Sequence, residues 1–134
     1  LIEFIETTIF GLINKISTEE ASGIKQVRAM VSMLIDFAQT NRGMTRVLIG
    51  DALVNENERW QERMNQLFER IEASIKQSFK VAVGDKELPE SFDAGARAAL
   101  VLAFVLGRWH RFAKSGFRKV PAEGIDVQMP ALVG

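Results

Sequence analysis

The chain has 134 residues, a length that favours one domain able to bury a hydrophobic core without disulfides or metals. Basic and acidic residues number 17 each, so the formal net charge is zero and the whole chain has no electrostatic attraction to nucleic acid or anionic lipid. The lack of cysteine excludes disulfides, thiolate metal sites and thiol catalysis. No signal peptide or membrane span is visible in the sequence, so we expect a cytoplasmic protein.

The first segment has the spacing of an amphipathic helix. Its apolar residues recur at steps of three and four and predict a helix over residues 1–17. They are Ile2, Ile5, Ile9, Leu12, Ile13 and Ile16, with Phe4 and Phe10 beside them. The chain opens inside this pattern, without methionine or a polar lead-in. We therefore expect it to be a piece of a longer protein whose N-terminal part precedes Leu1.

A second helix is predicted over residues 24–39, after a polar break in which Ser22 is the expected cap. Its apolar face is wider than one core contact requires, because Met30, Met33 and Phe37 form a second row. Together with Phe4 on the first helix, this row is a candidate apolar groove for a partner. Simple core packing of the same residues is the alternative, and the sequence leaves both open.

Residues 40–43 read as a turn, and residues 44–54 as a short helix weakened by Gly50. A long helix is predicted over residues 56–82, with Asn55 and Glu58 as its start signal. Its large apolar residues share one face. They are Trp60, Met64, Leu67, Phe68, Ile71, Ile75 and Phe79.

The last long helix is predicted over residues 91–115, with Ser91 as its cap and an end near Gly116. Residues 98–107 carry no polar side chain, yet the run is too short for a bilayer, which requires about 20 residues. It is therefore buried on every side, either by its own chain or by a second copy, and we favour the second copy. The predicted dimer interface consists of Phe68, Ile71, Ile75, Ala99, Leu100, Ala103, Phe104 and Gly107.

Beyond residue 116 the glycines and prolines allow only a brief helix near residues 125–132. No alternating strand pattern occurs, so the sequence predicts an all-α bundle of five or six helices. Its single histidine, His110, excludes histidine metal clusters, and no nucleophile can be paired with a base, so we expect no enzyme, metal or cofactor. A run of cations suits either phosphates or a solvated helix end: Arg108, Arg111, Lys114, Arg118 and Lys119.

Four stretches carry a resemblance to a known family: L-I-E-F-I-E, N-R-G-M-T-R-V-L-I-G-D-A-L, N-Q-L-F-E-R-I-E-A-S and R-F-A-K-S-G-F. The match runs from Leu1 to about Phe79 and again from about Arg111 to Pro121. The chain, taken as one domain over residues 1–134, therefore resembles the C-terminal domain of TetR-family regulators, and within that family the nucleoid occlusion factors. The resemblance implies a TetR-like bundle that forms a homodimer, in which residues 56–82 and 91–115 pack with the partner's pair as a four-helix bundle. It also implies an N-terminal helix-turn-helix DNA-binding domain, absent from this chain.

The same resemblance implies a nucleoid-associated protein whose groove, between residues 1–17 and 24–40, binds the C-terminal tail of the division protein FtsZ. Phe4 and Asn41 match the family's groove, whereas Leu12 and Thr40 replace basic residues. The first hypothesis is therefore a nucleoid occlusion factor that inhibits FtsZ ring assembly over the chromosome. The alternative is a ligand-responsive TetR repressor, whose small apolar effector needs an enclosed cavity of at least about 300 Å³.

Overall fold

The computed structural model describes residues 1–50 and 58–134, and the described residues form helices and connecting loops without a β-strand. The fold class expected from the sequence, an all-α bundle, is confirmed. The predicted helix start at Asn55 and the predicted helix over residues 51–54 lie outside the described residues. The helices are α1 (Ile2–Glu19), α2 (Gly23–Thr40), α3 (Arg42–Leu48), α4 (Glu58–Gly84), α5 (Ala94–Lys114) and α6 (Ile125–Leu132).

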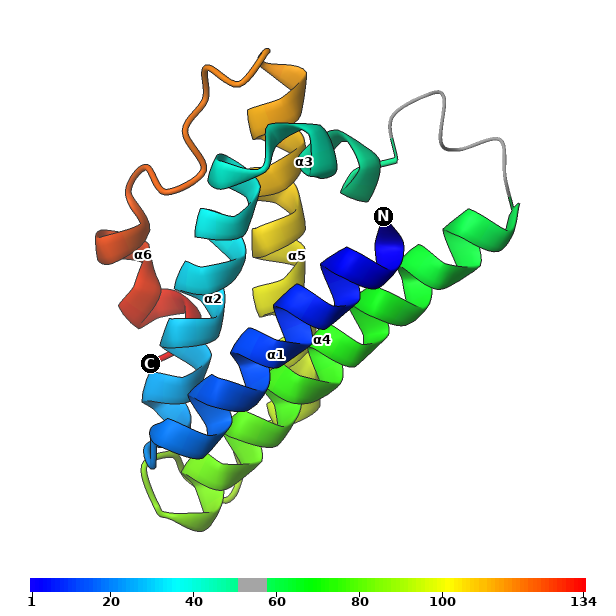
Figure 1. Cartoon of the computed structure of the whole chain (residues 1–134). Coiled ribbons are helices and arrows are strands. Elements are labelled where there is room, and N and C mark those ends of the chain that lie inside the picture. Colours follow the sequence, from blue (N-terminus) through cyan, green and yellow to red (C-terminus); the bar gives the residue numbers. More distant parts are fainter. Residues whose placement is uncertain (51–57) are drawn as a thin grey trace.

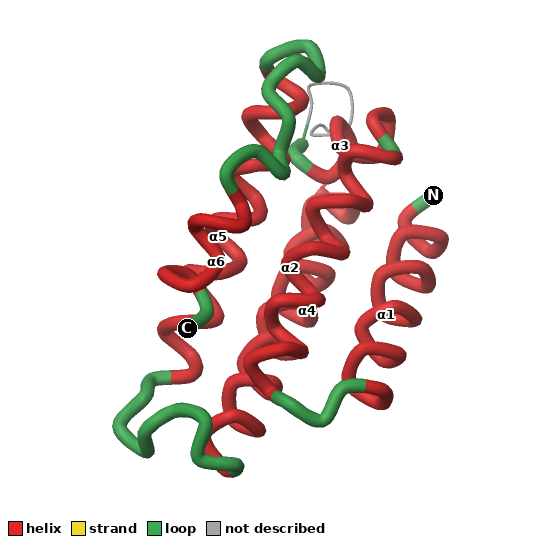
Figure 2. Tube along the Cα trace, turned by 90° about the vertical axis from the view of Figure 1, so that its left-hand side faces the viewer, coloured by secondary structure: helices red, strands yellow, loops and turns green. Residues whose placement is uncertain are grey.

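The long helix α4 forms a hairpin with α5, and α2 packs against both of them (Figure 1). α1 runs antiparallel to α2 and lies along α4. α3 lies across the end of the bundle, against α2 and α5 (Figure 2). α6 packs beside α5 near the chain's C-terminus. None of the described helices is long and apolar enough to cross a membrane.

The core lies where α2 meets α4 and α5. It consists of buried apolar side chains at helical spacing. Burial of each large one stabilises the folded state by roughly 1.5–3 kcal/mol relative to an exposed position. The largest fully buried ones are Trp109, Phe79, Ile5, Ile9, Met30, Leu34, Ile35, Leu67, Ile71, Ile75, Val27 and Val31. The apolar stripe predicted for residues 60–79 therefore faces this core as expected.

Helix ends follow local hydrogen bonding, and two of them differ from the prediction. The hydroxyl of Ser22 accepts a hydrogen bond from the Lys25 N–H and caps α2 as predicted. α5 is capped by Asp93, which accepts from the Ala96 N–H at 3.0 Å, so the prediction of Ser91 as the cap is wrong. Serine and aspartate both suit the N-cap position, and the prediction from the sequence put the cap two residues too early.

The turn predicted at residues 40–43 is also wrong. Only Asn41 separates α2 from α3, and Thr45 donates its hydroxyl across this break to the main-chain oxygen of Ala38. α3 ends at Leu48, and the predicted continuation through Gly50 fails because Gly50 has a φ of 76°. This left-handed conformation is open to glycine and terminates a right-handed helix.

Gly23, at the first turn of α2, allows that helix to approach α4 closely. A Cβ atom placed there would lie 2.3 Å from the main-chain oxygen of Ser78 and 2.5 Å from the nitrogen of Ala82. Beside this contact the Ser78 hydroxyl donates to Gln26, and the amide of Gln26 donates to the main-chain oxygen of Glu20. The close approach therefore includes a satisfied polar network, which fixes how α2 sits on α4.

Candidate functional site

The outer side of α1 carries large apolar side chains that no other helix covers. Leu1, Phe4 and Leu12 are 60%, 53% and 39% exposed. Their spacing places them on one side of the helix, beside the stripe of buried isoleucines. Single exposed apolar residues are ordinary, whereas a row of them along one helix is typical of a surface that binds a partner.

The candidate groove residues divide between this surface and the core. Phe4 is exposed, and Met33 and Asn41 are partly exposed, so these three remain available to a partner. Asn41 is oriented by a hydrogen bond of 2.9 Å from its Nδ2 to the main-chain oxygen of Phe37. Met30 and Phe37 are 0% and 6% exposed, so for these two the core-packing alternative holds and the groove assignment is corrected.

α5 presents an uncovered face along the run that lacks polar side chains. Ala99, Leu100, Ala103 and Gly107 are all exposed, and Leu100 is 52% exposed. No atom lies within 4 Å of the position that a Cβ of Gly107 would occupy. The chain's own residues therefore leave an apolar strip of small side chains around one leucine, wide enough for the close approach of another helix.

The other residues predicted for the dimer interface lie deeper. Phe68 is partly buried and contacts the Trp109 ring at 6.4 Å between centroids, and Phe104 is partly buried beneath the Arg108 guanidinium. Ile71 and Ile75 have no exposed surface, so they belong to the protomer's own core and cannot reach a second subunit. We remove these two from the predicted interface, because α4 directs them at α2 and α5.

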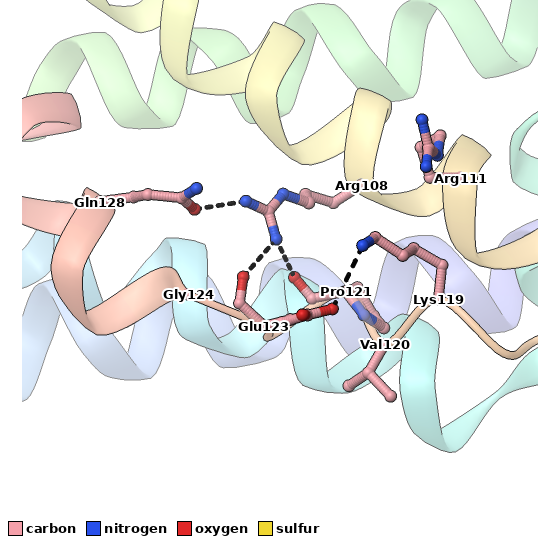
Figure 3. A pocket seen from close by; sticks show the side chains of 8 residues that line it. All are labelled: Arg108, Arg111, Lys119, Val120, Pro121, Glu123, Gly124 and Gln128. Atoms are coloured by element: carbon pink, nitrogen blue, oxygen red, sulfur yellow. Dashed lines mark hydrogen bonds and ion pairs between the residues drawn. The ribbon is translucent and has the colours of Figure 1, made fainter.

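A cleft of about 420 Å³ separates the end of α5 from the segment that leads to α6 (Figure 3). Its main cation, Arg108, donates to the main-chain oxygens of Pro121 at 3.2 Å and Glu123 at 2.6 Å, and to the side chain of Gln128. Lys119 forms an ion pair with Glu123 at 3.4 Å. Because these hydrogen bonds occupy the Arg108 guanidinium, its role is to fasten the segment to α5 and not to hold a ligand.

A second cleft, of about 280 Å³, lies between α3 and the first turns of α4. Val47, Leu48, Met64 and Phe68 line it together with Trp60, whose Nε1 is buried without a hydrogen-bond partner. The cleft opens to solvent, so it is not the enclosed cavity that an effector-binding bundle requires.

Sequence reasoning missed one cluster of side chains, because its members are far apart in the chain. Phe117 follows α5, and the guanidinium carbons of Arg42 and Arg46 on α3 lie 5.4 Å and 5.3 Å from its ring centroid. Only the tertiary contact between α3 and the end of α5 brings them together.

Residues 1–50 and 58–134 contain no group of three histidine, cysteine, aspartate or glutamate side chains that could hold a metal ion.

The described helices thus leave two apolar surfaces uncovered, the small-residue face of α5 and the row on α1. Residues 22–133 match the family model of the SlmA-like, tetracyclin repressor-like C-terminal domain. The chain belongs to this family, and the resemblance to TetR-family regulators is confirmed.

Curated relatives within the family are nucleoid occlusion factors. The chain is 42% identical to the nucleoid occlusion factor SlmA of Vibrio cholerae over 130 residues, which cover 94% of this chain and 64% of that protein. It is 38% identical to SlmA of Idiomarina loihiensis, with 96% and 65% covered, and 37% identical to SlmA of Alteromonas mediterranea, with 98% and 67% covered. The chain thus spans about two thirds of the length of these relatives, and slightly less for the first two.

Proposed function

We propose that this chain is the dimerisation and partner-binding domain of a DNA-associated nucleoid occlusion factor that inhibits FtsZ ring assembly over the chromosome. The observation that carries the proposal is the similarity to these three SlmA proteins along 94% to 98% of the chain. The role is one of binding, because the family consists of regulators, and it needs no cofactor.

A homodimer through α5 is the first part of the proposal. The exposed strip of Ala99, Leu100, Ala103 and Gly107 suits a second copy of the same helix, because small side chains let two backbones approach and Leu100 fills the space between them. Phe104, which is partly exposed, follows Ala103 on α5, and Phe68 on α4 remains a predicted member of the interface. In this arrangement α4 and α5 of each protomer pair as a four-helix bundle.

The partner surface is the second part. Phe4, Met33 and Asn41 lie on the antiparallel pair of α1 and α2 and offer two apolar contacts and one oriented amide. An extended peptide that carries apolar anchors matches this chemistry, and the FtsZ C-terminal tail is the proposed occupant. Leu12 extends the apolar row in place of a basic residue, so this groove favours apolar anchors over acidic ones.

DNA binding is the third part. We assign it to a helix-turn-helix domain outside these 134 residues, since the relatives are longer than this chain. Through that domain the protein would reside on the nucleoid in the cytoplasm. The domain described here would then present FtsZ with a surface that is anchored to the chromosome.

The test is a binding measurement between the full-length protein and a labelled FtsZ tail peptide, with and without the protein's operator DNA. Peptide binding by the unmodified protein, together with at least tenfold weaker peptide binding by the Phe4→Ala variant, supports the proposal, because Phe4 is the exposed anchor. Val127→Ala is the matched control, since Val127 is an exposed apolar residue on α6, away from α1. No binding in either condition would refute the FtsZ part of the proposal.

The second candidate, a repressor that responds to a small apolar effector, has weaker support. The cleft beside Trp60 measures about 280 Å³ and is open to solvent, whereas such effectors occupy enclosed cavities of roughly 300–1,000 Å³. The Nε1 of Trp60, which has no hydrogen-bond partner among the described residues, is the observation in this cleft that favours a ligand.

A further inference from the structure

Charged residues are distributed unevenly in this electrically neutral chain. Seven of its 17 lysines and arginines lie in residues 42–46 and 108–119, and these two segments contain no acidic residue. α3 packs against α5, so the fold brings both segments to one end of the bundle (Figure 1). Six of the seven have exposed side chains and are called the basic end: Arg42, Arg46, Arg111, Lys114, Arg118 and Lys119.

Phe117 is the centre of the basic end. Its φ of 65° is a conformation that residues other than glycine seldom adopt, and its ring is held by an edge-on contact with Phe112 at 5.1 Å between centroids. Arg42 and Arg46 both lie over this ring. An aromatic ring attracts and orders two guanidinium groups that would otherwise repel each other.

The ordinary explanation of such a cluster, a helix end favoured by its dipole, covers only part of it. Arg111 and Lys114 lie in the last turn of α5, where the helix dipole stabilises cations. Arg42 lies in the first turn of α3, where the dipole opposes a cation, and it stands four residues from the like charge of Arg46. Arg118 follows α5, and its Nε donates to the main-chain oxygen of Ser115 at 3.0 Å, so it caps the end of that helix. Arg42 is thus the cation of the basic end that helix stability does not explain.

Several of these cations are also available for a ligand. The side chains of Arg111 and Lys114 are exposed and form no hydrogen bond or ion pair with the rest of residues 1–50 and 58–134, and the Arg42 side chain has only its contact with Phe117. Lys119, in contrast, pairs with Glu123. The available groups come from two helices, and although Arg111 also lines the cleft at the end of α5, Arg42 and Lys114 lie outside it. Such an arrangement suits an extended polyanion better than a small ion.

We propose that the basic end binds the phosphate backbone of double-stranded DNA without reading its sequence. Arginine forks match phosphate oxygens, and exposed cations from two helices can contact successive phosphates of one backbone. The inference rests on the proposed function, which places the chain on the nucleoid. Leu1 lies at the same end of the bundle as α3 (Figure 1), so DNA held by a domain joined there would run past this surface.

The experiment measures binding of a fluorescent duplex of scrambled sequence to the 134-residue chain, as salt is raised from about 50 to 200 mM. One variant combines Arg42→Gln, Lys114→Gln and Arg118→Gln. The matched control removes three exposed lysines from the opposite end of the bundle: Lys15→Gln, Lys25→Gln and Lys80→Gln. Circular dichroism melting of all three proteins establishes that each remains folded.

Dissociation constants on the order of 10⁻⁵ M at the lowest salt are expected for the unmodified chain. The basic-end variant should bind at least about tenfold more weakly, with a logarithmic salt slope shallower by about two to three, while the control keeps both values. Absence of DNA binding, or equal losses in the two variants, would overturn the proposal. So would binding of polyglutamate without binding of DNA, which would identify the surface as a site for an acidic protein.

The same samples separate this proposal from the function proposed above. Sedimentation reports the dimer and the FtsZ tail peptide reports the partner groove, and none of the three substituted cations belongs to the α5 strip or is one of the groove residues Phe4, Met33 and Asn41. Retained dimerisation and peptide binding together with absent DNA binding would reject the basic end alone. DNA binding that the basic-end variant weakens, together with absent peptide binding or absent dimerisation, would reject the proposed groove or dimer and support the DNA-binding surface.

Discussion

The indole Nε1 of Trp109 donates a hydrogen bond of 2.9 Å to the main-chain oxygen of Leu34, in the middle of α2. Trp109 has no exposed surface, so this bond joins α5 to α2 inside the core, and it satisfies a polar group that would be costly to bury unpaired. The apolar part of the ring packs against Phe68 on α4. One residue thus links the three helices that form the centre of the bundle.

Replacing Trp109 with phenylalanine should lower the free energy of unfolding by about 2–3 kcal/mol, since it removes both the hydrogen bond and part of a filled volume. Urea unfolding followed by circular dichroism measures this change. Trp60→Phe is the matched control, because Trp60 is partly exposed and its Nε1 lacks a hydrogen-bond partner. Equal losses in the two variants would mean that the bond to Leu34 contributes nothing.

Gly23→Ala should destabilise the protein by at least about 2 kcal/mol, because the added methyl group meets the backbone of α4 and neither helix can yield. Gly11→Ala serves as the comparison. Gly11 lies inside α1, and no atom lies within 4 Å of the position that its added methyl group would take, so alanine there should stabilise by up to about 1 kcal/mol through helix propensity. Thermal melting of both variants measures these opposite changes in stability. A Gly23→Ala variant as stable as the unmodified protein would contradict the close contact.

Leu100→Glu should convert the proposed dimer to a monomer at micromolar concentration, since it places a charge without a partner in the centre of the α5 strip. Sedimentation velocity measures the result. Val127→Glu introduces the same charge on α6, at a residue 84% exposed, and should leave the dimer intact. An unmodified chain that sediments as a monomer would disprove the dimer itself.

Arg108→Ala should release the segment that leads to α6, because Arg108 donates to two of its main-chain oxygens and to Gln128. Hydrogen exchange of residues 120–134 should become at least about tenfold faster while exchange in α2 and α4 stays unchanged. Arg111→Ala, which removes an exposed arginine from the same helix, should leave exchange unaltered. Unchanged protection in the Arg108 variant would show that apolar packing and the hydrogen bonds from Arg97 to Leu132 and from Arg28 to Gly134 hold α6 without Arg108.

The positions of the helices follow largely from local pattern. The period of the isoleucines in α1, the single apolar stripe of α4 and the capping hydroxyl of Ser22 each predict an element that the structure contains. These features act over one or two turns, so a single sequence carries them. Where two nearby residues suit the same role, as Ser91 and Asp93 do at the start of α5, local chemistry does not choose between them.

What the sequence by itself determined is the fold class, the buried stripe of α4 and the apolar strip of α5. Tertiary packing decided which apolar residues stay at the surface: Met30 and Ile71 entered the core, while Phe4 and Leu100 did not. It also gathered Arg42 and Arg46 around Phe117, which stands about seventy positions further along the chain. The physical reason is that helical periodicity tells which side of a helix is apolar, whereas only its neighbours determine how much of that side is covered.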